Sequence, residues 1–390
     1  MQKNERKDAV QLMLRFVRGS LGLFALGLIC SMLNTACNSL TPQIIRMTVD
    51  SVIGSGEMPG WFQTLGLDRL MQSDVKSVLL LAAAAVLVTA VLSGIFSFFA
   101  RLNTAKASER AIKSLRDELF GHIQKLPFSW HTAHQTGEII QRCTSDVEVV
   151  RNFVSAQMVE VFRIVFLIVM TMCIMFSMNV KISLVAVVFI PIIVFYSFYF
   201  QGKISHRFMG ADIAEGKLSS TVQENLTGVR VVRAFGRENF EIERFDEKNN
   251  AFSELWIRLG HMMTAYWSTG DLITALQVLT VIAVGTVSAV NGEITLGEFL
   301  AFVSYNATLN WPVRALGKIL AEMSKTGVSI SRISYILHAQ PEQDPPEALT
   351  PPMDRDICFE HVTFSYENQK PVLNDVSFTI PAGKTFAILG

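Results

Sequence analysis

Charged residues are scarce in this sequence of 390 amino acids. Asp, Glu, Lys and Arg make up 17 % of it, against about 25 % in an ordinary soluble protein. Acidic and basic residues balance at 34 each, so the basic excess that is typical of nucleic-acid-binding proteins is missing and we expect no nucleic-acid partner. Because 50 % of the residues are hydrophobic, this composition indicates that much of the protein lies in an apolar solvent.

Cysteine is also sparse. The five cysteines show neither the short spacing of a zinc or redox site nor the pattern of a disulfide scaffold. With 24 Gly and 12 Pro, the sequence is neither collagen-like nor of low complexity. We therefore expect no metal site and no disulfide framework within this chain.

Six long runs contain no Asp, Glu, Lys or Arg. They cover residues 19–45, 77–100, 164–180, 182–202, 272–292 and 299–313. A helix needs about 20 mainly apolar residues to cross a bilayer, and the short sixth run is prolonged by Leu316, Ile319 and Leu320. The sequence therefore predicts a mainly α, polytopic membrane protein with six transmembrane helices.

The basic residues predict the orientation. Eight Lys or Arg lie between positions 101 and 151 and nine between 203 and 258, whereas the connections on the opposite side carry few. Because basic loops stay in the cytoplasm, we expect cytoplasmic N- and C-termini in a multi-pass protein of the plasma membrane.

Two long stretches on the predicted cytoplasmic side keep helical periodicity. The first hairpin (residues 101–163) has a break between Leu126 and Gly137, and we expect the second (residues 203–271) to break near Gly228. Each reads as a helical hairpin with an aromatic tip. Either the hairpins are solvated extensions, or they dock another domain, which their pairing favours.

The composition changes after the sixth run. Residues 339–355 are rich in Pro and acidic side chains and read as a linker. Strand patterns follow at 357–366, 376–380 and 385–389, with a turn at 381–384. We thus divide the chain into a transmembrane domain (1–338), a linker (339–355) and the start of a second domain (356–390). A domain that stops after a buried strand cannot complete its sheet, so we expect the chain to be part of a longer protein.

Several segments together resemble the ABC exporter family, in its half-transporter form. They are ENLTGVRVVRAFGRE at 224–238, FEHVTFSY at 359–366 and VLNDVSF at 372–378, with GEI at 137–139 and NGEITLG at 291–297 in support. The resemblance implies that residues 356–390 begin an α/β P-loop ATPase domain. It also implies that the protein uses ATP and Mg²⁺.

The resemblance assigns roles to individual residues. Tyr366 would stack on the adenine, and Gly390 would open the phosphate-binding loop, so all catalytic residues are expected beyond Gly390 and none within the chain. The hairpin tips would couple nucleotide-driven motion to the spans. The residues expected to do so are Phe128, Trp130, His131, Gly228, Arg233 and Phe235. The first tip departs from the family, because it has Phe-Ser-Trp-His where Phe-Phe-Asp is common.

Polar and aromatic residues inside or beside the apolar runs are candidates for a substrate cavity. They are Asn34, Asn38, Asp271, Tyr305, Asn306, Asn310 and Trp311. A polar side chain inside a membrane is costly, so a role in binding or transport is the first hypothesis for it. Bonds between neighbouring helices explain them equally well.

The resemblance implies a subunit of a dimeric exporter that couples ATP hydrolysis to outward transport of an amphipathic or hydrophobic solute, such as a drug, lipid or peptide. Its partner would be a second half-transporter, identical or different, and membrane lipid would surround both. The alternative is a polytopic channel or receptor whose soluble tail binds partners. A Gly-Lys-Ser/Thr at the fifth to seventh positions after Gly390 would distinguish the two.

Overall fold

The computed structural model describes residues 15–16, 18–52, 75–343, 347–349, 351–352, 354–365 and 370–388. The chain divides into two compact units, Met1–Gln340 and Pro341–Gly390. Tyr366 and Gly390, for which the sequence predicts roles in nucleotide binding, lie outside the described residues.

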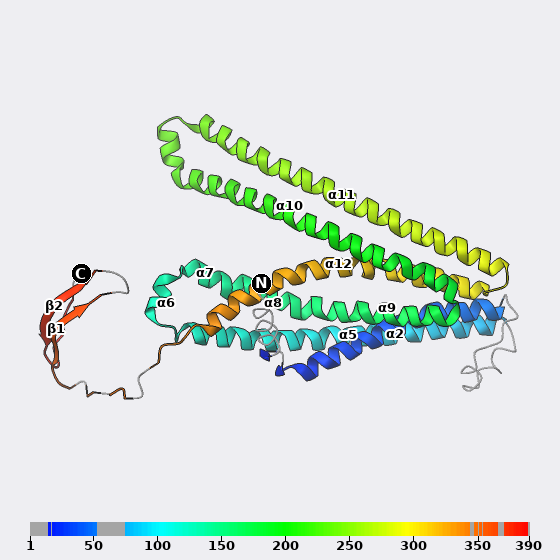
Figure 1. Ribbon diagram of the computed structural model, residues 1–390, viewed down its shortest axis with the longest axis horizontal. Coiled ribbons are helices and arrows are strands. Elements are labelled where there is room, and N and C mark those ends of the chain that lie inside the picture. The colour runs from blue at the N-terminus through cyan, green and yellow to red at the C-terminus, as the bar shows by residue number, and fades with distance from the viewer. Residues whose placement is uncertain are drawn as a thin grey trace. The chain divides into compact units, whose positions relative to one another are not determined.

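Among the described residues, six long helices build the first unit (Figure 1). They are α2 (Leu21–Val52), α5 (Val75–Ile123), α9 (Met158–Met178), α10 (Val180–Ala234), α11 (Glu238–Val290) and α12 (Leu296–His338). Short segments join α5 to α9. They are α6 (Phe128–Ala133), α7 (Thr136–Gln141), the π-helix η1 (Arg142–Asp146), α8 (Val147–Asn152) and the π-helix η2 (Phe153–Gln157).

Five stretches of the described residues are long and apolar enough to cross a membrane. They are Leu21–Val52, Val75–Ile123, Thr136–Met178, Val180–Ala234 and Glu238–Val290. Helix α12 does not meet that measure, because Asn, Tyr, Trp and Pro interrupt its apolar run. It nevertheless packs against α2, α9, α10 and α11. The sixth span stays a prediction.

The first predicted hairpin break is confirmed, and the second is wrong. Helix α5 ends at Ile123, and the short helices α6 and α7 follow (Figure 1). In contrast, α10 continues through Gly228 to Ala234, and the turn lies at 235–237. Two polar links between the helices, Asn225 to Glu241 at 2.8 Å and Arg244 to Glu224 at 2.8 Å, hold this part of α10 against α11.

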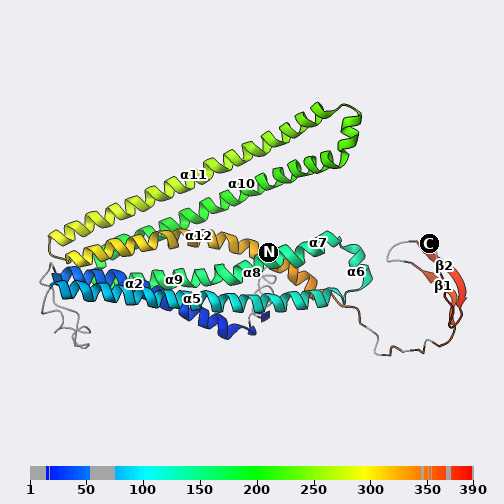
Figure 2. The ribbon, with the colours of Figure 1, turned by 180° about the vertical axis from the view of Figure 1, so that it is seen from behind.

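Helices α10 and α11 run side by side and diverge from α5 and α9 toward the turn that joins them. Figure 2 shows this from behind, with the last turns of α10 bending across toward α11. At the other end of the unit, α10 and α11 both pack against α12. The pair therefore forms an arm that is attached at one end.

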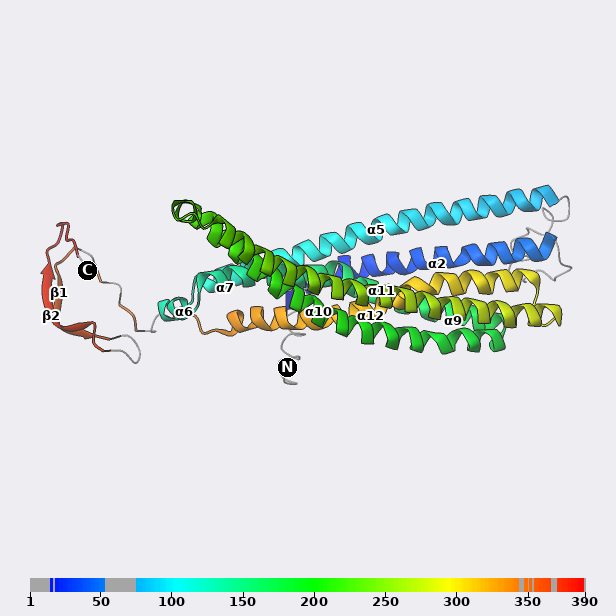
Figure 3. The same cartoon turned by 90° about the horizontal axis from the view of Figure 1, so that it is seen from above.

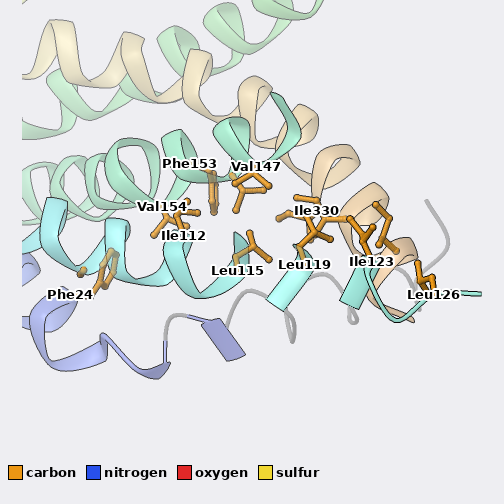
Figure 4. Packing of buried hydrophobic residues seen from close by; sticks show 14 residues of the cluster. Phe24, Ile112, Leu115, Leu119, Ile123, Leu126, Val147, Phe153, Val154 and Ile330 are labelled. Atoms are coloured by element: carbon orange, nitrogen blue, oxygen red, sulfur yellow. The ribbon is translucent and has the colours of Figure 1, made fainter. Parts of the chain in front are cut away.

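A hydrophobic cluster holds the first hairpin to the end of α12 (Figure 4). Ile112, Leu115, Leu119 and Ile123 recur on one face of α5, as their spacing predicts, and are all buried. Phe120, next to Leu119, is 65 % exposed. The cluster also contains Val147, Val150, Phe153, Val154, Ile330, Ile333 and Ile336.

A second cluster joins α9, α10, α11 and α12. Its most buried members include Ile182, Ala186 and Phe302, each with 0 % exposure. On the other side, α2 packs against both α5 and α12, as seen from above in Figure 3. Helix α12 thereby contacts all the other long helices and organises the unit.

A polar clasp joins the end of α2 to the beginning of α12. The Gly297 N–H donates to Asp50 Oδ1 at 2.9 Å, and the Thr295 hydroxyl donates to Asp50 Oδ2 at 2.8 Å. Arg46 pairs with Glu298 at 2.6 Å, and Thr295 and Glu298 form a capping box. The carboxylate of Asp50 thus satisfies one of the backbone N–H donors that a helix start leaves free.

The second unit contains an antiparallel pair, β1 (Ile357–Phe364) and β2 (Leu373–Ile380). Phe359 and Phe378 face each other across it, with ring centroids 4.4 Å apart. The predicted turn is confirmed by the bond from Lys384 N to Pro381 O at 3.2 Å. The predicted third strand is wrong as far as residues 385–388, which are irregular.

Candidate functional site

Asn34 and Asn38 meet a serine of the neighbouring helix. Asn34 Nδ2 donates to Ser93 Oγ at 2.9 Å and to Ser93 O at 2.8 Å, and the Ser93 hydroxyl donates to Asn38 Oδ1 at 2.8 Å. Ser93 lies on α5, so these bonds fasten α2 to α5 inside the apolar region. Sequence reasoning missed Ser93, because a single serine in an apolar run carries no pattern.

The polar residues of α12 face two different helices. The Tyr305 hydroxyl donates to Ser39 O on α2 at 2.6 Å, and Tyr305 is 1 % exposed. Asn306 Oδ1 accepts a hydrogen bond at 2.7 Å from Gln277 Nε2 of α11. The Gln277 side chain is also 1 % exposed. Among the described residues, three buried amide atoms of α11 and α12 have no hydrogen-bond partner: Gln277 Oε1, Asn306 Nδ2 and Asn310 Oδ1. Trp311, in contrast, is 69 % exposed.

Asp271 pairs with an arginine of α12. Arg314 Nη1 donates to Asp271 Oδ1 at 2.9 Å, and Nη2 donates to Thr274 Oγ1 at 2.9 Å. The Asp271 side chain is 71 % exposed and that of Arg314 only 11 %. The charge pair therefore presents its negative end outward.

A cavity of about 770 Å³ lies between α2, α5, η2, α9 and α12. Its lining mixes small, polar and charged residues: Ser31, Asn34, Ser97, Ala100, Arg101, Thr104, Ala105, Ser155, Ala156, Gln157, Val159, Glu160, Arg163 and Ile319. Of the seven residues predicted for a substrate cavity, Asn34 lines it. The other six lie elsewhere in the unit.

Two arginines give this cavity its charge. Arg163 donates to both carboxylate oxygens of Glu160, at 2.8 Å and 2.5 Å. Arg101 lies across the cavity on α5. With one carboxylate against two guanidinium groups, the charged lining of the cavity has a positive excess. Apolar residues such as Ala100, Val159 and Ile319 also line the cavity, and they suit the hydrocarbon part of a bound solute.

The tip of the first hairpin is partly anchored and partly free. The Trp130 ring stacks on His134 with centroids 4.2 Å apart, and His131 Nε2 lies 3.2 Å from Ile123 O. Phe128 is 70 % exposed and contributes nothing to the buried cluster. The anchored residues fix the direction of α6, and Phe128 is left at the surface.

The tip of the second hairpin has the same character. Phe235 is 76 % exposed, and Gly236 follows with φ at +61°, which closes the turn. Arg233 lies in the last turn of α10, where its carbonyl accepts the Gly236 N–H at 3.3 Å. Gly228 is helical and half-buried, with nothing within 4 Å of a Cβ added there, so no close contact requires a glycine.

The predicted nucleotide-binding residues of the second unit stay predictions. Tyr366 and Gly390 lie outside the described residues. Within the described ranges, no group of three His, Cys, Asp or Glu side chains could hold a metal ion.

Comparisons with known proteins agree with the helical architecture. Residues 24–313 match the family model of the ABC transporter transmembrane region. An uncharacterized ABC transporter ATP-binding protein of Bacillus subtilis, YknU, is 26 % identical over 373 residues, which cover 94 % of this chain and 60 % of the relative.

Two further relatives have more specific names. A putative multidrug export ATP-binding/permease protein of Bacillus subtilis, YgaD, is 29 % identical over 73 % of this chain and 49 % of its own length. An ATP-dependent lipid A-core flippase of Pseudoalteromonas translucida is 26 % identical over 83 % of this chain and 56 % of its own length. The chain thus spans about half the length of the curated relatives it matches. Because the family model covers most of the chain, the protein belongs to the ABC transporter family, and residues 24–313 are its transmembrane region.

Proposed function

We propose that this chain is the membrane-spanning part of a dimeric exporter that uses ATP binding and hydrolysis to move an amphipathic or hydrophobic solute outward. The observation that carries the proposal is the pair of hairpin tips. Phe128 and Phe235 are 70 % and 76 % exposed at the ends of two separate helical arms. Large exposed aromatic residues at such tips favour docking of another domain.

The six long helices, α12 included, are proposed as the six spans of one half-transporter. The N- and C-termini would face the cytoplasm of a cell bounded by this membrane, because the basic residues concentrate in the two hairpins. A second half-transporter, identical or different, would complete the transport path. The arm formed by α10 and α11 supports this, since many of its large apolar side chains are exposed in the described part of the chain.

The cavity between α2, α5, α9 and α12 is proposed as part of the solute's path. Its positive charges at Arg101 and Arg163 and its apolar wall suit a molecule with both a polar and an apolar end. Two relatives are named for multidrug export and for lipid A-core flipping. Drugs and lipids are therefore the first solutes to try.

ATP and Mg²⁺ are proposed as cofactors of the full-length protein. Tyr366 would stack on the adenine, and Gly390 would begin the loop that cradles the phosphates. Stacking is worth about 1–3 kcal/mol per base in nucleic-acid sites, which is roughly tenfold or more in affinity. We expect Tyr366→Ala to raise the dissociation constant for ATP by about that factor and Tyr366→Trp to leave it nearly unchanged. An unchanged constant in a folded Tyr366→Ala protein would contradict the assignment.

The decisive experiment tests the hairpin tips in the full-length transporter. Single cysteines replace Phe128 or Phe235 in a cysteine-free background, and a short heterobifunctional photo-crosslinker is attached. Phe208→Cys is the matched control, because Phe208 is also an exposed aromatic residue of α10, at 45 %, but lies well before its tip. We expect crosslinks to the nucleotide-binding domain from the two tips and none from position 208.

The same protein in inside-out vesicles measures transport. We expect ATP-dependent uptake of a fluorescent lipid or a hydrophobic dye, and loss of that uptake once the tips are crosslinked. A protein whose tips never crosslink and whose vesicles show no ATP-dependent uptake of any tested solute would overturn the proposal.

A further inference from the structure

Arg314 is tied into the bundle by three contacts. Its two terminal nitrogens bond to Asp271 and Thr274, and its guanidinium carbon lies 5.7 Å from the centroid of the Trp267 ring. Gly270 makes the room, because a Cβ there would lie 3.3 Å from that carbon. With its side chain 11 % exposed, Arg314 orients Asp271 and offers little surface to a ligand.

Asp271 has the opposite character. Only its Oδ1 accepts a bond from Arg314, and Oδ2 has no hydrogen-bond partner among the residues that the structure describes. The side chain is 71 % exposed. Trp267, four residues earlier, lies on the same face of α11 and is 47 % exposed. A free carboxylate oxygen and an indole ring therefore lie next to each other on one surface.

The depth of this surface suits the head of an amphipathic molecule. Asp271 begins the charge-free run 272–292, and Arg314 ends the run 299–313. Aromatic rings gather at the same level, since Tyr196 stacks on Tyr266 with centroids 5.6 Å apart. Such rings mark the boundary between hydrocarbon and head groups. A solute held here keeps its tail in the bilayer and its head beside Asp271.

We propose that Asp271 and Trp267 form a subsite for the ammonium group of an amphipathic cation. A carboxylate oxygen accepts hydrogen bonds from an ammonium group or attracts a quaternary one, and an aromatic face adds a cation–π contact. An anionic head group would meet the negative end of the charge pair, while the positive end is buried. This proposal rests on the proposed function, and it specifies that the transported solute carries a positive charge.

The test uses two probes with the same apolar body in the full-length transporter in nanodiscs. One is a fluorescent alkyl-trimethylammonium compound, and the other is its neutral tert-butyl analogue. Direct binding is followed by fluorescence anisotropy, and ATPase stimulation is followed in parallel. We expect Asp271→Asn to weaken binding of the cation about threefold to thirtyfold, with less than a twofold change for the neutral analogue.

Companion variants separate this subsite from general effects. Asp271→Glu and Trp267→Phe should retain most of the preference for the cation, and Trp267→Leu should lose part of it. Asp212→Asn is the matched control, since it removes an exposed carboxylate from α10 away from the subsite. It should change neither probe.

The outcomes separate this proposal from the proposed function. Loss of cation binding in Asp271→Asn with the neutral analogue unaffected supports the subsite, even in a protein without solute-stimulated ATPase activity, and in that case only the exporter proposal fails. Equal binding of both probes to wild type and Asp271→Asn overturns the subsite, even if ATP-driven transport is observed. An equal loss for both probes also overturns it, because it indicates a structural role alone.

Discussion

Gly297→Ala is the sharpest test of the clasp between α2 and α12. The Gly297 N–H donates to Asp50 Oδ1 at 2.9 Å, so the two helices approach closely at this point. An added Cβ would lie 2.4 Å from the Arg46 carbonyl oxygen and 2.6 Å from the Asp50 carboxyl group. The nearest atom belongs to the backbone and cannot rotate away. The start of α12 must therefore move.

The size of the effect follows from the contact. Ordinary van der Waals contact begins near 3.4 Å, so α12 must shift by about 1 Å relative to α2. Overpacking of this kind costs about 1–3 kcal/mol, and the same shift weakens the bond to Asp50. A cost of about 2 kcal/mol corresponds to a fall in Tm of roughly 3 °C in a unit of the length of Met1–Gln340, because the entropy of unfolding grows with chain length.

Thermal unfolding of the purified protein in detergent measures this change. Gly210→Ala is the matched control, because the same methyl group on α10 would have nothing within 4 Å and should stabilise the helix by about 0.5–1 kcal/mol. Combining Gly297→Ala with Asp50→Ala should cost less than the two single changes together, since both act on one contact. If Gly297→Ala unfolds at or above the temperature of wild type, our reasoning on the clasp is refuted.

Two further predictions concern the hairpin core and the turn before α12. Leu119→Ala should destabilise the protein by about 2–5 kcal/mol in the same assay, because Leu119 is 1 % exposed, whereas Phe120→Ala, at a 65 % exposed position, should change stability by no more than about 0.5 kcal/mol; equal effects would contradict the core assignment. The Ser288 hydroxyl and Lys181 hold the pKa of Glu293 below its usual value, so the Glu293 carboxylate stabilises the fold above about pH 4.5 and loses that effect as the pH falls through the lowered pKa. Tm should therefore separate wild type from Glu293→Gln at neutral pH, and the difference should shrink as the pH falls through the lowered pKa of Glu293; a pH-independent difference would argue against this role.

The sequence predicted the elements better than their contacts. Missing charge in runs such as 77–100 and 182–202 marks helices reliably, because a bilayer leaves few alternatives. The break predicted near Gly228 does not form. A glycine within a helix costs only about 1 kcal/mol, and the polar links between α10 and α11 outweigh that cost. The strand predicted at 385–388 does not form for another reason. Its apolar pattern needs neighbouring strands, and those are not supplied by β1 and β2 as described.

The site residues show the same limit. Asn34, Tyr305 and Asp271 stood out as polar groups in apolar runs, but their partners Ser93, Ser39 and Arg314 depend on how distant helices pack. No spacing in the sequence brings those pairs together. Whether a polar residue lines the cavity or links two helices is decided by tertiary contacts alone.

The length of the arm formed by α10 and α11 has a mechanical consequence. Helix α11 has 53 residues and so measures about 80 Å from end to end. A stiff rod of that length amplifies angles: a tilt of about 5° at the anchored end displaces the far end by roughly 7 Å. Conversely, a modest push at Phe235 becomes a small, forceful rotation among the packed helices. A large displacement at the tip of the arm would therefore correspond to a small rotation with a large torque at its anchored end.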